Sequence, residues 1–292
     1  MHTETNSQIS QVLSLVDDLF DGRQTKAYRL AIQLGADGLT AAVWDDVYNK
    51  ALALERFAFQ KAFNTNTLLA LTSSTIKQSS ILSYPYKKVS LAVVNAKSTL
   101  VPNVLFDANE KEALLKFNHP LEDGEVIAID KLPNLDATSI YALPKAIEQQ
   151  FKELYTHLNI SHYSSALIEN VLLANKHTSA ANVIVNVRSG GFEVLVINSG
   201  KLLFYNTFSY QTPEDFIYYL LFVFEQLKLN PETVNVELLG ELEKNSAVYK
   251  LLYKYIRNIK FGDRPDNFDY SFKITALPKQ YYYSLFSQFL FS

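Results

Sequence analysis

The sequence predicts an α/β protein in which one folding unit occurs twice. Two segments, one starting at Tyr28 and the other at Val183, alternate apolar and polar residues and turn at glycines, as antiparallel strands joined by short hairpins do. After each segment, stretches with helical spacing alternate with short apolar runs. When Gly38 is set against Gly191, the apolar positions of the two segments coincide. A repeat of this kind predicts two domains of similar structure.

The first unit is predicted to open with a helix and to continue as a three-stranded meander. Over residues 8–20, Ile9, Val16 and Phe20 belong to one apolar helical stripe. Beyond it, the predicted elements are strands at 28–34, 39–43 and 51–57, a helix over 64–81 and a buried strand at 89–94.

The chain near residues 100–136 is less regular and is predicted to be a small insertion, with a helix near 109–117 and a strand at 126–129. Behind it we expect a strand at 139–142 and a helix that starts at Pro144 and carries its apolar stripe to Leu158. A brief strand and helix over 162–176 complete the first predicted domain, residues 1–178.

The second predicted domain, residues 179–292, repeats this order. Its meander is followed by a helix at Thr212, where a capping residue precedes a proline and two acidic residues. A strand at 233–239, a helix over 248–256, a strand at 259–261 and an aromatic helix from Pro278 follow. The matched positions of the two meanders are Leu30 with Val183, Ile32 with Val185, Leu34 with Val187, Leu39 with Phe192, Ala41 with Val194, Val43 with Val196, Lys50 with Lys201 and Phe57 with Phe208.

Composition and charge exclude several classes of protein. The chain is 48% hydrophobic and 20% charged, as a folded protein is, and its lack of cysteine removes disulfides, thiolate zinc sites and cysteine nucleophiles. A net charge of -3 gives no attraction to nucleic acid. The longest apolar run, Phe216 to Phe224, is too short to span a membrane, and the N-terminus does not resemble a signal peptide. We therefore expect a cytoplasmic protein with no direct membrane insertion.

The order strand-strand-strand-helix-strand-helix-strand-helix is that of the ribonuclease H-like fold, here with a five-stranded mixed sheet flanked by helices in each domain. Two copies in one chain resemble the actin-like ATPase superfamily. Within it, the chain looks most like a family of uncharacterised bacterial proteins with a degenerate actin-like fold, similar to the pilus-assembly protein PilM. The segment Ser139 to Pro144, the stretch from His162 to Ala174 and the second meander follow the order seen in PilM and its relatives.

The resemblance implies a nucleotide site at the two hairpins, and the sequence departs from it there. Active members carry Asp-x-Gly at the end of the first strand of each meander, for magnesium, water and phosphate. Here the loops read Gln33-Leu34-Gly35 and Asn186-Val187-Arg188, and the adenosine-binding glycine pair is reduced to Gly240. An amide supplies neither the charge that favours magnesium nor a general base. The residues of this vestigial cleft are Gln33, Gly35, Asp37, Gly38, Asn186, Arg188, Ser189, Gly190, Gly191 and Gly240.

Several residues near these loops have two readings. Asp37 reaches the cleft if its turn curls inward, whereas Asp-Gly is also a preferred hairpin turn, and Asp45 and Asp46 form another turn. Arg188 either places a fixed positive charge in the cleft or points to solvent.

Three further features have a structural and a functional reading. His157 and His162 lie five residues apart and are expected to be ordinary surface histidines rather than metal ligands. A basic stripe of helical spacing, expected to be a solvated face, comprises Lys250, Lys254, Arg257 and Lys260. Of the C-terminal aromatics, Tyr282, Phe286 and Phe289 share a core-facing side of the helix, which leaves Tyr281, Tyr283 and Phe291 for packing elsewhere or for a homodimer or partner surface.

These observations favour a non-enzymatic pseudo-ATPase that acts as an interaction or scaffold module for an unknown protein partner and needs no cofactor. One alternative is an ATPase or nucleotide-dependent switch that binds ATP and magnesium through altered loops. Another, implied by the likeness to PilM, is a cytoplasmic scaffold of a membrane assembly.

Overall fold

A computed structural model describes residues 8–60, 62 and 64–291, which form two compact units. The first unit comprises the described parts of residues 1–167, 266–277 and 285–292, and the second comprises residues 168–265 and 278–284. The C-terminal part of the chain therefore contributes to both units.

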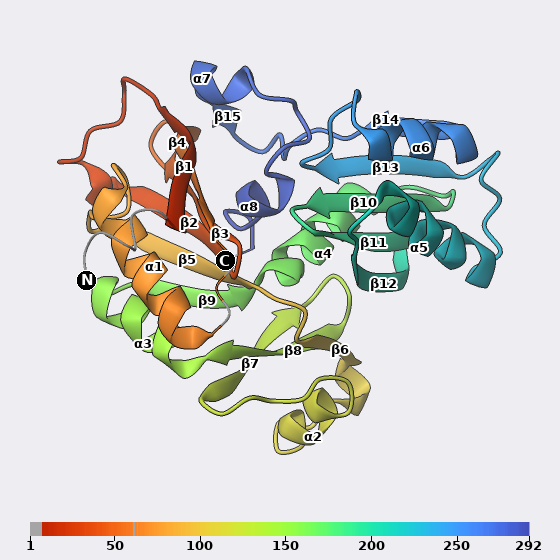
Figure 1. Cartoon of the computed structure of the whole chain (residues 1–292), viewed down its shortest axis with the longest axis horizontal. Helices are drawn as coiled ribbons and strands as arrows, with labels where there is room; N and C mark the ends of the chain where they lie inside the picture. The colour runs from red at the N-terminus through yellow and green to blue at the C-terminus, as the bar shows by residue number, and fades with distance from the viewer. Residues whose placement is uncertain (1–7, 61, 63, 292) are drawn as a thin grey trace. The chain divides into compact units, whose positions relative to one another are not determined.

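The first unit contains a seven-stranded mixed sheet (Figure 1). Its order is β1-β4-β3-β2-β5-β9, and β15 also pairs with β4. The strands are β1 (Ile9–Val16), β2 (Tyr28–Gly35), β3 (Gly38–Asp45), β4 (Lys50–Phe59), β5 (Lys88–Val94), β9 (Leu158–His162) and β15 (Asp269–Tyr270). Short 3-10 turns lie at η2 (Thr25–Ala27) and η3 (Asn103–Leu105), and α7 (Phe272–Thr275) follows β15.

Two helices, α1 (Thr65–Gln78) and α3 (Lys145–Leu154), lie together against this sheet (Figure 1). Alternate residues of β2, such as Ile32, face Leu71 of α1 and Phe151 of α3 in one hydrophobic core. Asn64 caps α1, because its side-chain oxygen accepts a hydrogen bond of 2.9 Å from the backbone N–H of Thr67. The period-two pattern of β2 is therefore explained by helices that cover one face of the sheet.

A three-stranded antiparallel sheet of order β6-β8-β7 forms the predicted insertion. It consists of β6 (Ser98–Pro102), β7 (Glu125–Leu132) and β8 (Ala137–Pro144), with α2 (Lys111–Lys116) packed beside it (Figure 1). Its small core contains Val101, Leu115 and Ile140. The insertion thus folds around a few apolar residues of its own.

The second unit contains a five-stranded mixed sheet of order β12-β11-β10-β13-β14. The strands are β10 (Asn182–Arg188), β11 (Gly191–Asn198), β12 (Lys201–Ser209), β13 (Asn235–Gly240) and β14 (Asn258–Phe261). The helices α5 (Pro213–Gln226) and α6 (Ala247–Tyr255) pack on the face that carries Val183, Val185 and Val187. Thr212 and Asp215 form a complete capping box at the start of α5, as predicted.

The predicted repeat is confirmed in strand order and in register. The strands β4-β3-β2-β5-β9 correspond to β12-β11-β10-β13-β14, and both sheets are mixed. Gly35 pairs with Gly38 as Arg188 pairs with Gly191, so Gln33 and Asn186 occupy equivalent positions. Both meanders also shift register at the same place, between Val43 and Trp44 in the first and between Val196 and Ile197 in the second. The α/β class and the duplicated five-strand unit are therefore confirmed.

The predicted N-terminal helix over residues 8–20 is wrong, because β1 occupies Ile9–Val16 and pairs with β4. A β-bulge shifts the register between Gln11 and Leu13. An extra residue in a strand resets its alternation. The apolar residues consequently recur at a spacing that resembles a helical stripe, although the backbone is extended.

Two later boundaries also differ from the prediction. The helix expected to reach Leu158 ends at Leu154, and Leu158 starts β9, whose parallel pairing with β5 competes with further helix. At the C-terminus the expected long aromatic helix is the short α8 (Tyr283–Ser287). Tyr283 is buried with Phe286 and Phe289, so it does not belong to an exposed surface.

Candidate functional site

The first hairpin loop, residues 33–38, keeps its backbone shape through two glycines. A Cβ atom on Gly38 would overlap the carbonyl oxygen of Phe57, so β3 and β4 approach too closely for any other residue. The carboxylate of Asp37 folds back over Gly35, with Oδ1 2.9 Å from the place where a Cβ would stand. A carboxylate in this position repels a phosphate unless a cation lies between them.

In the second hairpin loop, the sequence-predicted residues Asn186 and Arg188 both bind Glu193. Nδ2 of Asn186 donates to Oε2 of Glu193 at 2.7 Å, and Nε of Arg188 donates to Oε1 at 2.7 Å. Glu193 is fully buried, whereas the side chain of Arg188 is 29% exposed. The guanidinium also lies over Gly191, 3.2 Å from its would-be Cβ position. Arg188 therefore neither points freely to solvent nor offers an unpaired charge.

Ser189 and Gly190 form the exposed tip of this hairpin, and Gly190 has a positive φ of 66°. Glu193 is not among the sequence-predicted site residues, because it lies within the strand rather than at the strand end. The signal was present: it is the one charged residue in the otherwise apolar strand from Gly191 to Ile197. A charge in a buried strand requires partners, and Asn186 and Arg188 provide them.

Gly240 ends β13 and is held from two sides. It has a φ of 79°, and a Cβ atom there would overlap the carbonyl oxygen of Val187. Its N–H donates to the carbonyl of Gln280 at 2.9 Å, and the next N–H, that of Glu241, donates to Val187 at 2.7 Å. A glycine is therefore required at this position because β13 and β10 approach each other closely there.

A second polar cluster lies where β9 meets α4 (Tyr163–Ala174), and the sequence analysis did not single it out. Oδ2 of Asp130 accepts the backbone N–H of His162 at 2.8 Å and the hydroxyl of Ser165 at 2.6 Å. Burial raises the pKa of Asp130 to about 6, although both hydrogen bonds work to lower that pKa. Asp130 thus tethers β7 to the start of α4.

The His162 ring is buried in the same cluster. Its Nε2 lies 3.1 Å from the carbonyl oxygen of Asn95, which can only accept, so Nε2 carries a proton. Nδ1 lies 2.6 Å from the Ser164 hydroxyl, which then donates to it. The expectation of a surface histidine is confirmed for His157, which is exposed, and is wrong for His162, which is buried. Among residues 8–60, 62 and 64–291, no three His, Asp or Glu side chains are grouped as metal ligands.

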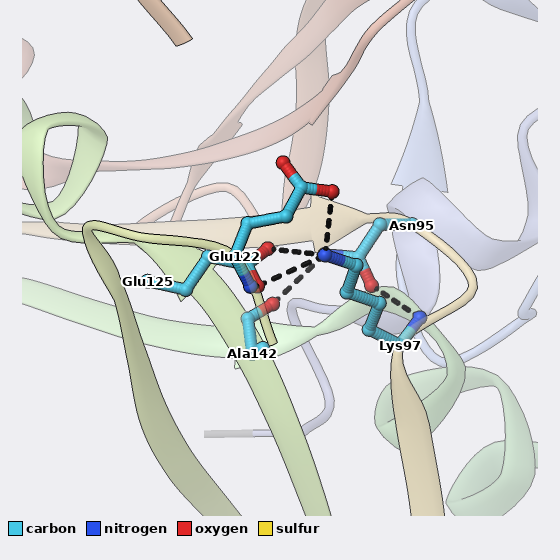
Figure 2. Close-up of polar contacts among 5 residues, drawn as sticks. All are labelled: Asn95, Lys97, Glu122, Glu125 and Ala142. Carbon is cyan, nitrogen blue, oxygen red and sulfur yellow. Dashed lines mark hydrogen bonds and ion pairs between the residues drawn. The ribbon is translucent and has the colours of Figure 1, made fainter. Parts of the chain in front are cut away.

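Lys97 connects the first residues of the insertion to its β7 end, as Figure 2 shows. Its Nζ lies 3.0 Å from Glu122 Oε1 and 2.9 Å from both Glu125 oxygens. Burial works to lower the pKa of Lys97, but the bonds to Glu125 and Glu122 outweigh it and raise that pKa. Asn95 donates to the carbonyl of Ala142 at 2.9 Å, which completes the contact (Figure 2). This cluster holds the insertion in place and leaves the lysine charge neutralised.

The predicted basic stripe is not a single helix face. Helix α6 ends at Tyr255, so Arg257 and Lys260 lie beyond it. Lys260 belongs to β14 and pairs with Glu237 at 2.8 Å. The continuous helical spacing of the four residues is therefore coincidental.

The duplicated units and paired hairpin loops define a protein with the actin-like ATPase fold, and solved structures agree. A Bacteroides thetaiotaomicron VPI-5482 protein of actin-like ATPase fold and unknown function is 24% identical, covering 84% of this chain and 94% of its own, with a TM-score of 0.74. The PilM-PilN type IV pilus biogenesis complex is 12% identical, covering 90% and 98%, with a TM-score of 0.60.

A family model described as a protein of unknown function (DUF3822) matches residues 17–259. The chain therefore belongs to this family. No curated protein matches it. None of the helices in the described part of the chain has the length and apolar character that crossing a membrane requires.

Proposed function

We propose that this protein is a non-enzymatic actin-like module that binds a protein partner and acts as a scaffold. The observation that carries the proposal is the ion pair of Arg188 with Glu193. At the strand end where the resemblance expects a metal-binding aspartate and a phosphate-contacting glycine, Asn186 and Arg188 bind both oxygens of a buried carboxylate. In the first loop the Asp37 carboxylate lies over Gly35. In each hairpin a charged side chain, Asp37 in the first and Arg188 in the second, thus lies over a glycine of the same hairpin.

The likeness to the PilM-PilN complex supports a particular form of this proposal, in which the protein is a cytoplasmic scaffold of a membrane assembly. That complex contains PilM bound to a partner protein and has a TM-score of 0.60 to this chain. We also propose that the chain divides near residue 178 into two ribonuclease H-like domains. The protein partner binds to the outer surface of the protein rather than to the vestigial cleft.

The proposal is tested by thermal denaturation of the full chain with magnesium and ATP. A ligand that binds the folded state raises the melting temperature, and the stabilisation grows with the logarithm of the ratio of ligand concentration to dissociation constant. We expect no change at millimolar ATP with magnesium, compared with magnesium alone and with ATP in EDTA. A magnesium-dependent rise that is already present at micromolar ATP would contradict the pseudo-ATPase and favour the nucleotide-dependent switch.

A further inference from the structure

A groove of about 580 Å³ opens in the first unit at the amino ends of β2, β5 and β9. A second hollow of about 430 Å³ adjoins it, because Lys87, Thr156 and His157 line both. The groove lies at the opposite ends of these strands from the hairpin loop at Gly35. It is therefore separate from the first hairpin loop.

The lining of this groove is strongly basic in a chain whose net charge is negative. The groove and the adjoining hollow together are lined by four cationic side chains, those of Arg29, Lys87 and Lys88 in the groove and that of Lys26 in the hollow, and by a single carboxylate, that of Asp46. Asp46 is shared by Arg29 and Lys87, each at 2.7 Å. Within the described residues, neither Lys26 nor Lys88 has an ion-pair partner. Two lysines thus keep an unneutralised charge at the rim.

The groove itself is lined by polar Thr156, His157 and Asn159, and the adjoining hollow contributes aromatic and apolar walls. Tyr86 and Tyr155 are buried, and their hydroxyls donate to the carbonyls of Ile81 and Leu82 at 2.6 and 2.7 Å. Leu154 stands beside them and is 47% exposed. Adjacent strands lie about 4.8 Å apart, so the amino ends of three neighbouring strands span about 10 Å. This length accommodates roughly three residues of an extended chain.

We propose that this groove binds an acidic segment of a partner protein, with carboxylates on Lys26 and Lys88 and an apolar side chain against Leu154. The inference rests on the proposed function as a protein-binding module. Helix α3 ends in the lining, and the partial negative charge of a helix C-terminus opposes a compact polyanion such as a phosphate. Carboxylates spread along an extended peptide reach the rim lysines without approaching that end.

The test is fluorescence polarisation of the full chain with a labelled ten-residue peptide that alternates Glu and Leu, beside its Gln-for-Glu counterpart. We expect the Glu peptide to bind and its affinity to fall as salt is raised, because exposed charges are screened. The double variant Lys26→Glu, Lys88→Glu is expected to weaken binding at least tenfold. The matched control, Lys131→Glu with Lys244→Glu, changes two exposed lysines outside the groove by the same charge and is expected to bind normally.

Three results would overturn the inference: equal binding of the Gln peptide, equal weakening by both double variants, or inorganic pyrophosphate binding to the same lysines without peptide binding. Circular dichroism of each variant shows whether it is folded. If the Lys26→Glu, Lys88→Glu variant no longer binds the peptide, the peptide site in the groove is supported, whether or not ATP changes the melting temperature. If it retains the peptide while ATP still fails to raise the melting temperature, this inference falls and the proposed function stands.

Discussion

Glu193 places a negative charge inside the second unit. Its two hydrogen-bond partners determine how much this buried charge lowers the free energy of unfolding. Arg188 and Asn186 bind one oxygen each at 2.7 Å. Removing one partner of a buried ion pair leaves the other charge uncompensated. Asn186 and Arg188 therefore compensate the buried carboxylate of Glu193.

We predict that Arg188→Ala lowers the free energy of unfolding by roughly 2–4 kcal/mol, because Glu193 then stays buried without its cation. The double variant Arg188→Ala, Glu193→Gln should recover most of this loss, since a neutral amide is cheaper to bury. Urea denaturation of the three proteins measures both effects. A loss below about 1 kcal/mol for Arg188→Ala would show that the pair is not structural.

Asp130 predicts a pH dependence with a definite sign. Burial raises the pKa of Asp130 to about 6, so between pH 4 and 6 the folded state holds a proton that the unfolded state has lost. This favours folding at low pH, and the advantage disappears as pH rises through 6. Relative to Asp130→Asn, the wild type should lose roughly 2–2.5 kcal/mol of stability between pH 4 and pH 7. Urea titrations across this range measure the difference, and a constant difference would contradict the raised pKa.

For single residues, the sequence predicted the position in a strand better than it predicted the side-chain partner. The equivalence of Gln33 and Asn186 followed from alternation around two glycine turns, which is local information. The pairing of Asp130 with His162 joins residues far apart in the chain, and no local pattern encodes it. For Glu193 the partners lie in the adjacent strand, so its isolation among apolar residues was the available signal.

Strand β1 illustrates how an element can be misread. Its bulge between Gln11 and Leu13 produces a helix-like spacing of apolar residues. The pairing with β4 also supplies Ser14 to the buried carboxylate of Glu55, at 3.0 Å, beside Ser79 and Ser80. The pairing of β1 with β4 therefore makes this segment a strand, although its apolar spacing resembles that of a helix. The uninterrupted alternation of β2, β3, β10 and β11 made those strands predictable.

The turns that end strands predict a graded series of glycine substitutions. Gly124, Gly200 and Gly240 all have positive φ, of 84°, 72° and 79°. At Gly124 an added Cβ meets nothing within 4 Å, at Gly200 it lies 2.8 Å from the carbonyl oxygen of Lys176, and at Gly240 it overlaps Val187. We expect Gly124→Ala to cost about 1 kcal/mol from backbone strain alone.

Gly200→Ala should cost more than this, and Gly240→Ala should cost the most, because β13 must move away from β10. Thermal denaturation of the three single variants ranks them. If Gly240→Ala were as mild as Gly124→Ala, the close passage at Val187 would not constrain the fold.

For the molecule as a whole, the duplication was predictable and the path of the C-terminus was not. The repeat is visible in the sequence as two hairpins, and in the structure these hairpins have the same register and the same bulge position. The return of the chain to the first unit depends on the two-residue strand β15 and on the stacking of Phe268 on Trp44, with ring centroids 4.4 Å apart. Elements this short carry no periodic signal.

The interleaved C-terminus has a consequence for cutting the chain. Because the chain changes unit after Pro265, after Leu277 and after Ser284, no single cleavage separates two complete units. A nick beside α4 leaves an N-terminal fragment without β15, while the C-terminal fragment carries the aromatic residues that cover Trp44. When the nick falls before α4, the C-terminal fragment keeps the whole second unit and also carries the segments that complete the first, so only the N-terminal fragment depends on the other piece.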